Sequence, residues 1–189
     1  MAAEVNRLLT PAEYLAFERE SETKHEYVTG EIVAMVGASE EHNLIQMDTS
    51  TSLNIQLRPK GCLIYGSDMR VKVGALGIYT YPDITVVCGG SELEDQQRDT
   101  LLNPTVIIEI LSPSTQRYDR GLKFRRYQLI PSLRDYLLIA QDEPRVEHYT
   151  IGQDGDLKLR VYRAPDAVIE LPTIGCRLPL AEIYFRITF

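Results

Sequence analysis

The chain has 189 residues, a length that fits one domain with a single hydrophobic core. Its 44% hydrophobic and 25% charged residues are typical of a globular protein, and no apolar run is long enough to cross a membrane. The formal net charge of −7 argues against a surface covered with the Lys and Arg side chains that contact nucleic-acid phosphates, although it is compatible with a local basic patch.

The three cysteines, Cys62, Cys88 and Cys176, lie far apart and form no zinc-binding pattern. We therefore expect reduced, buried thiols rather than a disulfide framework. The N-terminus contains no apolar stretch of the kind found in signal peptides. These features together predict a cytoplasmic protein that is not associated with a membrane.

The first predicted element is a helix from about residue 10 to residue 20. Thr10 is a preferred N-cap residue, Pro11 suits the first helical position, and Glu13 completes a capping box. The following segment, 25–36, alternates in the manner of strands and contains Thr29-Gly30 in its middle. This pattern predicts a β-hairpin that turns at these two residues.

A longer helix is predicted over about 40–57, with Ser39 as its N-cap. Leu44, Met47 and Ile55 recur in it at helical spacing. We expect these three residues to mark its apolar face.

Short apolar runs rich in β-branched residues predict most of the remaining elements. Strands are expected at about 62–65, 68–73, 82–88, 104–111, 136–140, 145–151 and 157–163, with a helix at about 119–129 and a β segment at the C-terminus. The polar segment 89–99 is predicted to be a surface loop. This order of elements indicates an α/β or α+β sheet with helices packed on it.

Two carboxylates interrupt apolar strands in this pattern. Asp83 follows Pro82 at the start of one predicted strand, and Glu109 lies within the next. An ionised carboxylate in such a run is costly unless it is paired or bound to a metal. Because alternate strand residues share a face, Glu109 is expected on the same face as Ile107 and Leu111. If the two strands are neighbours, both carboxylates can converge on one hard cation.

The chain resembles the Uma-type putative restriction endonucleases of the PD-(D/E)xK nuclease superfamily. The resemblance lies in His25–Glu31, Tyr81–Asp83, Val106–Thr115, Asp119–Lys123 and Ile130–Tyr136. It implies a restriction-endonuclease-like core with a central mixed β-sheet flanked by helices, with added β-hairpins. The expected organisation is a single domain, 1–189, with an N-terminal helix and hairpin at 1–38, the core at 39–141 and a C-terminal β extension at 142–189.

The resemblance also implies a catalytic site. Asp83 and Glu109 would hold Mg²⁺ or Mn²⁺ together with a backbone carbonyl next to Glu109, for the hydrolysis of DNA. The superfamily places a lysine two residues after the glutamate, but this position is Leu111 here. The resemblance instead points to Lys123, which would reach the scissile phosphate from the following helix. Glu26, in the hairpin motif, is implied as an accessory acid.

Each of these residues could also have a purely structural role, without taking part in catalysis. Asp83 could cap a turn, and Glu109 could pair with an arginine in the core. Lys123 could form an exposed ion pair with Asp119, four residues before it on the same helix. Glu26 could be exposed to solvent.

Further candidates surround this set. The segment with Arg117, Arg120 and Arg126 is a candidate surface for substrate phosphates, or else a solvated helix face. His42, at the start of the helix 40–57, could approach the site, but a histidine at a helix end is more often incidental. Tyr127 is expected to pack rather than to support the lysine.

Two functions remain open from the sequence. The first is a metal-dependent DNA endonuclease, expected to be a homodimer because double-strand cutting needs two sites. The second is a catalytically inactive module of the same fold that serves in binding or assembly, as the missing in-strand lysine suggests. The sequence does not distinguish DNA from RNA as the substrate.

Overall fold

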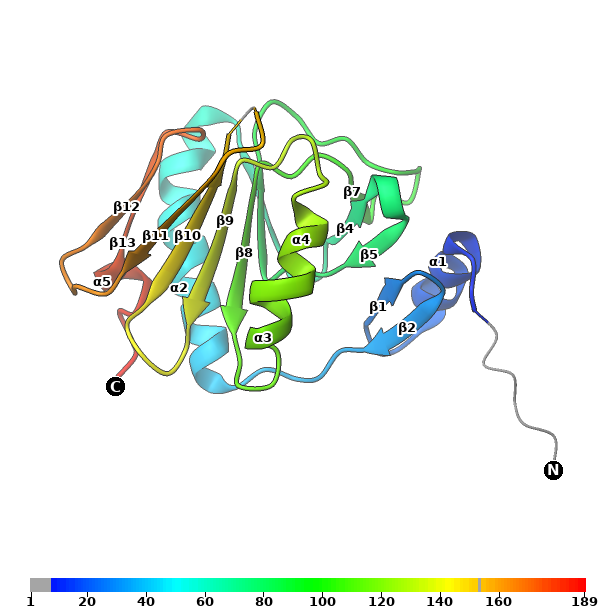
Figure 1. The fold of residues 1–189 in the computed structure, drawn as a ribbon, viewed down its shortest axis with the longest axis horizontal. Helices are drawn as coiled ribbons and strands as arrows, with labels where there is room; N and C mark the ends of the chain where they lie inside the picture. The colour runs from blue at the N-terminus through cyan, green and yellow to red at the C-terminus, as the bar shows by residue number, and fades with distance from the viewer. Residues whose placement is uncertain (1–7, 153) are drawn as a thin grey trace.

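The computed structural model describes residues 8–152 and 154–189 (Figure 1). The helices are α1 (Pro11–Glu20), α2 (Glu40–Leu57), α3 (Gln116–Tyr118), α4 (Phe124–Tyr127) and α5 (Leu180–Ile183), with the short turns η1 (Arg58–Lys60), η2 (Gly74–Leu76) and the π-helical η3 (Asp119–Lys123). The strands are β1 (His25–Val28), β2 (Glu31–Ala34), β3 (Leu63–Gly66), β4 (Arg70–Val73), β5 (Ile78–Thr80), β6 (Ile84–Val87), β7 (Thr100–Leu101), β8 (Val106–Leu111), β9 (Asp135–Ala140), β10 (Val146–Ile151), β11 (Leu157–Tyr162), β12 (Val168–Leu171) and β13 (Cys176–Pro179). The expected elements are present, whereas β5, β7 and α5 were not expected.

The largest sheet has the strand order β11-β10-β9-β8-β6-β3. Within it β8 and β9 are parallel, and all other neighbours are antiparallel. Figure 1 shows α2 on one face of this sheet and α3 and α4 on the other. A mixed sheet flanked by helices confirms the expected fold class.

Strand β8 separates two hydrophobic clusters, and all of its residues are buried. Val106, Ile108 and Ile110 pack with side chains of α2, whereas Ile107 and Leu111 pack with side chains of α4. The predicted alternation is therefore correct, and it leaves Glu109 on the α4 face of the sheet. Full burial of each aliphatic side chain contributes about 1.5–3 kcal/mol, so the strand that holds Glu109 is firmly fixed.

A second sheet, in the order β2-β1-β5-β4-β7, brings the N-terminal hairpin against the core. Tyr27 of β1 is paired with Tyr79 of β5, and its ring centroid lies 5.0 Å from that of Tyr14 in α1. The predicted capping box is present, since Thr10 accepts from the Glu13 amide at 3.2 Å and its own amide donates to the Glu13 carboxylate at 2.8 Å. Because Tyr27 faces this aromatic cluster, Glu26, the residue before it in β1, points to the opposite side.

The expectation of three reduced cysteines is wrong. Cys62 and Cys88 form a disulfide, with their Cα atoms 4.3 Å apart, and only Cys176 is a free, buried thiol. Pairing of Leu63 with Val87 in the β3–β6 ladder leaves the two cysteines as the next opposed pair. The spacing of 26 residues along the chain did not reveal this register.

The buried face of α2 also differs from the prediction. Met47 and Ile55 are 61% and 70% exposed, while Ile45 and Leu53 are completely buried. Thr49 and Ser52 are buried beside them. The buried face of α2 therefore includes small polar side chains and is not a purely apolar stripe.

In the part of the chain that the structure describes, no helix is both long enough and apolar enough to span a bilayer.

Candidate active site

The β6–β8 ladder positions the two carboxylates that interrupt the apolar strands. Ile84 is paired with Ile108, so one further step of this antiparallel register sets Asp83 opposite Glu109. Directly opposed residues have their Cβ atoms roughly 4.5–5.5 Å apart. The Ile110 amide donates to Asp83 Oδ2 at 2.7 Å, which holds the Asp83 carboxylate against β8.

Lys123 meets Glu109 from the helix that covers the same face of the sheet. Its Nζ lies 2.9 Å from Glu109 Oε1, and both side chains are no more than 7% exposed. Lys123 ends the π-helical turn η3, a geometry frequent at functional sites. Leu111, at the usual lysine position, belongs to the apolar cluster under α4, so the ammonium group enters from η3 instead.

Tyr127 does more than the expected packing. Its hydroxyl donates to Glu109 Oε1 at 2.9 Å and lies 3.0 Å from the Thr80 hydroxyl. One Glu109 oxygen is thus held by both the ammonium of Lys123 and a phenol. Glu109 has no arginine partner among the described residues, so the interpretation as an Arg-paired core glutamate is wrong.

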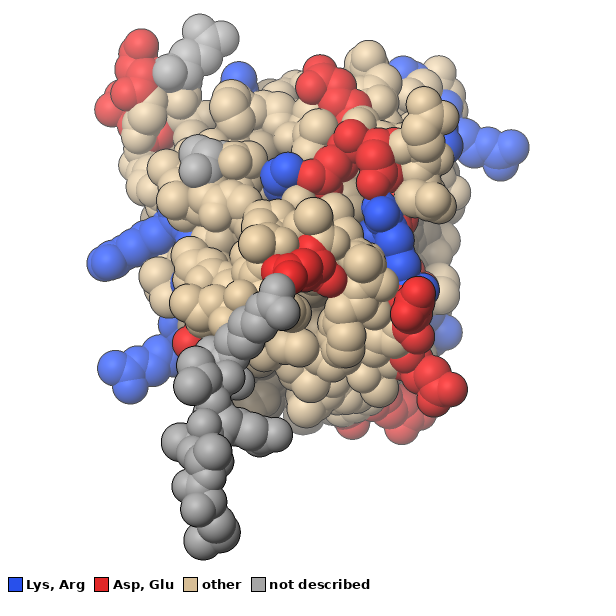
Figure 2. All heavy atoms as spheres, turned by 90° about the vertical axis from the view of Figure 1, so that its right-hand side faces the viewer, with Lys and Arg blue, Asp and Glu red and all other residues tan. Residues whose placement is uncertain are grey.

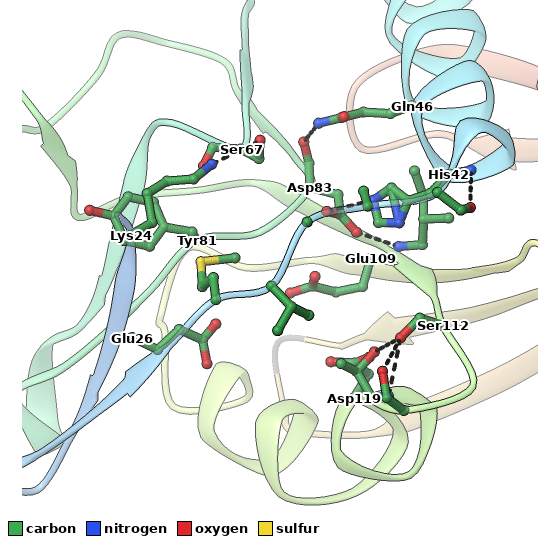
Figure 3. Close-up of a pocket in the computed structure, with 18 of the residues that line it drawn as sticks. Lys24, Glu26, His42, Gln46, Ser67, Tyr81, Asp83, Glu109, Ser112 and Asp119 are labelled. Atoms are coloured by element: carbon green, nitrogen blue, oxygen red, sulfur yellow. Dashed lines mark hydrogen bonds and ion pairs between the residues drawn. The ribbon is translucent and has the colours of Figure 1, made fainter. Parts of the chain in front are cut away.

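Two further carboxylates approach the same ammonium group. Glu26 Oε1 lies 3.1 Å from Lys123 Nζ, and Asp119 Oδ1 lies 3.8 Å from it. Glu26 is 8% exposed and Asp119 is 4% exposed, so neither the solvent-exposed interpretation of Glu26 nor an exposed Asp119–Lys123 pair is correct. Figure 3 shows Glu26, Asp83, Glu109 and Asp119 around one cavity.

His42 is a direct neighbour of this group, so its interpretation as an incidental helix-end residue is wrong. Its Nε2 lies 3.0 Å from Asp83 Oδ1, and Gln46, one turn later in α2, donates to the Asp83 carbonyl at 2.6 Å. Ser39 caps α2 by accepting from the His42 amide at 3.2 Å. The N-terminal turn of α2 therefore positions both the side chain and the backbone of Asp83.

The charges in the cavity are not balanced. Four carboxylates line it, against the ammonium groups of Lys123 and Lys24, and Lys24 is itself paired with Asp68 at 3.0 Å. Burial raises the pKa of Asp83 above its usual range and that of Glu109 well above it, against the opposing effect of Lys123. Burial also opposes the charge on Lys123, but the surrounding carboxylates and Tyr127 outweigh it and raise the pKa of Lys123 well above its usual value.

The donor atoms fit a hard divalent cation. Asp83 and Glu109 supply carboxylate oxygens, and Ile110 lines the cavity beside them. Glu26 Oε1 is buried and makes no aligned hydrogen bond, although it lies within ion-pair distance of Lys123 Nζ. Within the described ranges, no group of three or more His, Cys, Asp and Glu side chains is arranged as a metal site. A cation here would thus rely on two carboxylates and on backbone or substrate oxygens.

Of the three predicted substrate-binding arginines, two form contacts within the protein and one is exposed. Arg120 donates to Glu147 at 2.9 Å, and Arg126 donates to the Tyr118 hydroxyl at 2.8 Å, so both are engaged within the protein. Arg117 is exposed, as is Arg125. On the face shown in Figure 2, acidic and basic side chains are interspersed among uncharged ones, with no continuous basic surface.

Sequence reasoning gave no role in the site to Asp119, Gln46 or Tyr127. One available signal was spacing: Asp119 and Tyr127 lie four residues before and after Lys123, on one helix face. Gln46 likewise lies one turn after His42. Their role depends on how α2 and η3 cross the sheet, which the local sequence does not specify.

Known proteins resemble this chain over most of its length. The model of the Uma2 family, described as putative restriction endonucleases, matches residues 11–181. Two uncharacterized proteins of Synechocystis sp. are similar: slr1290 is 38% identical over 96% of this chain and 94% of the relative, and sll1609 is 35% identical over 90% and 96%.

Among solved structures, the fold matches the crystal structure of a putative nuclease belonging to DUF820 from Anabaena variabilis. The TM-score is 0.77 at 22% identity, and the match covers 94% of this chain and 98% of that one. By the match of its sequence to the family model, the chain belongs to the Uma2 family of putative restriction endonucleases.

Proposed function

We propose that this protein is a metal-dependent endonuclease that hydrolyses phosphodiester bonds in DNA. The observation that supports this proposal most strongly is the convergence of Asp83, Glu109 and Lys123 in one cavity of a nuclease-family fold. An apolar sheet gains no packing from carboxylates at these positions, and their burial is costly without a counter-charge.

Asp83 and Glu109 would hold Mg²⁺ or Mn²⁺, together with the backbone carbonyl of Ile110. Such a cation, when bound, lowers the pKa of a coordinated water and offsets negative charge on the phosphate. The Ile110 amide and His42 orient the Asp83 carboxylate, and Tyr127 orients that of Glu109. These contacts fix the ligands before a substrate arrives, as an electrostatically preorganised site requires.

Lys123 would neutralise charge that develops on the phosphate in the transition state. Its ammonium group is surrounded by carboxylates, which keep it protonated at neutral pH. The same contacts hold it beside Glu109, so it would stand next to a phosphate that is bound at the cation. A point charge on a flexible stem suits this role.

A non-catalytic binding or assembly module is the second candidate. One observation favours it: the ammonium of Lys123 is already satisfied by Glu109 and Glu26, as in a purely structural network. In that case the cluster would stabilise the fold without needing a metal.

Cleavage assays separate the two candidates. Purified protein should cut DNA with Mg²⁺ or Mn²⁺ but not with EDTA. Asp83→Asn should abolish cutting and preserve the fold, because the amide keeps the shape of the carboxylate but loses the charge that holds the cation. Lys123→Ala should slow cutting by about 100-fold or more without preventing metal binding, the usual cost of losing one transition-state donor.

Asp166→Asn is a matched control, since Asp166 is an exposed carboxylate outside the cavity. It should leave cutting unchanged. Cutting that survives Asp83→Asn would indicate a different site. If no DNA is cut and no Mn²⁺ is bound, the assembly module is the better explanation.

A further inference from the structure

The cavity that contains the site is narrow and partly covered. It has a volume of about 740 Å³, within the range of small-molecule pockets. Residues 35–39, which connect β2 to α2, line one wall, and Figure 3 shows this segment crossing in front of the carboxylates. Glu109 and Lys123, at 4% and 6% exposure, lie at the bottom of this space.

An intact duplex does not fit this geometry. Double-stranded DNA is stiff over roughly 150 base pairs and keeps both backbones on the outside of a wide cylinder. A phosphate in the interior of such a duplex cannot reach carboxylates that lie at the bottom of a partly covered cavity. An unpaired strand can bend so that one phosphate reaches the bottom.

A second pocket adjoins the first. It has a volume of about 570 Å³ and is lined by Ser114, Arg117, Tyr118, Gly121, Leu122 and Arg125. Ser114 and Tyr118 also line the first cavity, so the two spaces share a wall.

The charges of this second pocket are available to a ligand. Arg117 and Arg125 are exposed, and neither has an ion-pair or hydrogen-bond partner for its side chain in the described part of the chain. Tyr118 lines both spaces, and its ring is held by Arg126, whose guanidinium is 5.8 Å from the ring centroid. Aromatic rings beside exposed cations are the usual components of single-strand binding sites.

We propose that the site takes an unpaired DNA strand rather than an intact duplex, and that this strand leaves the cavity past Tyr118, with its following phosphates on Arg117 and Arg125. This inference rests on the proposed nuclease function for its choice of ligand. Its binding surface, however, lies outside the group of Asp83, Glu109 and Lys123 and can be tested without cleavage.

The test is binding of a fluorescent single-stranded oligonucleotide in EDTA, measured by anisotropy at several salt concentrations. A hairpin duplex of the same length is the comparison. The single strand should bind more tightly than the duplex. Arg117→Ala/Arg125→Ala should weaken this binding and make the slope of log K against log salt shallower by about 1.4, since each lost phosphate contact on a single strand contributes about 0.7.

Arg58→Ala/Arg160→Ala is the matched control. It also removes two exposed arginines, one just after the C-terminal end of α2 and one on the edge strand β11. Its affinity and salt slope should equal those of the wild type. Equal or tighter binding of the duplex, no detectable single-strand binding, or a double variant that behaves like this control would each overturn the inference.

Cleavage separates failure of this inference from failure of the proposed function. With Mn²⁺, circular single-stranded DNA should be cut faster than relaxed, covalently closed duplex. If the relaxed duplex is cut equally fast, the nuclease proposal stands and the unpaired-strand inference is wrong. If the strand binds through Arg117 and Arg125 but nothing is cut, the inference about binding stands and the nuclease proposal is wrong.

Discussion

Replacing Lys123 with methionine removes one buried positive charge and keeps most of the volume of the side chain. The ammonium lies 2.9 Å from Glu109 and 3.1 Å from Glu26, with 7% of the lysine side chain exposed. Breaking a buried ion pair by removing one partner costs about 3–5 kcal/mol, because the other charge is left uncompensated. For a chain of this length, each kcal/mol lowers the melting temperature by about 2–4 °C, so we expect a fall of about 6–20 °C.

The assay is thermal unfolding in EDTA near pH 8, where the carboxylates are charged in the unfolded chain. The loss should shrink as the pH falls through the raised pKa of Glu109, since protonation then neutralises this carboxylate. Glu109→Gln in the Lys123→Met background should recover part of the loss. A Lys123→Met variant as stable as the wild type near pH 8 would refute the view that this ammonium group compensates the negative charge of the carboxylates in the cavity.

Four other predictions follow from the same cluster and from the β3–β6 ladder. In EDTA, Asp83→Asn should raise the melting temperature by about 2–4 °C, because it removes a buried negative charge that destabilises the metal-free protein by about 1 kcal/mol. A fall in the melting temperature would contradict the view that the cavity carries excess negative charge. Because the pKa values of Asp83, Glu109 and Asp119 are raised in the folded protein, the contribution of these three groups to metal-free stability should be greatest below their ordinary values near 4 and should decrease as the pH rises through the raised values. Mn²⁺ competes with these protons, so its stabilising effect should be larger at about pH 8 than at about pH 5 in thermal melts, and the opposite trend would exclude these ligands. Cys62→Ser/Cys88→Ser should cost about 3–4 kcal/mol, as expected for a loop closed over 26 residues, and reductant should have the same effect on the wild type but none on the variant.

Much of the fold could be predicted from local patterns. The capping box of α1, the hairpin β1–β2 and the alternation in β8 each depend on residues close together in the chain, and all three are present. The buried face of α2 could not be predicted, because it includes the small polar residues Thr49 and Ser52, which hydrophobic periodicity does not detect. The disulfide depends on the register between β3 and β6, which no local pattern reveals.

The candidate site could also be predicted only in part, because some of its contacts join elements that are distant in the sequence. Asp83 and Glu109 stand out because carboxylates are rare in apolar strands, and Lys123 was found through the family resemblance. The burial of Glu26 arises from pairing of β1 with β5, a strand that was not predicted. The contact of His42 with Asp83 depends on the direction of α2 over the sheet, so helix-end statistics alone misjudged it.

Calorimetric titration with Mn²⁺ tests the metal site most directly. We expect saturable binding by the wild type and by Asp166→Asn, and none by Asp83→Asn or Glu109→Gln, with all four proteins folded. The absence of binding to the wild type, or equal binding by Asp83→Asn, would contradict the proposal that Asp83 and Glu109 hold the catalytic cation.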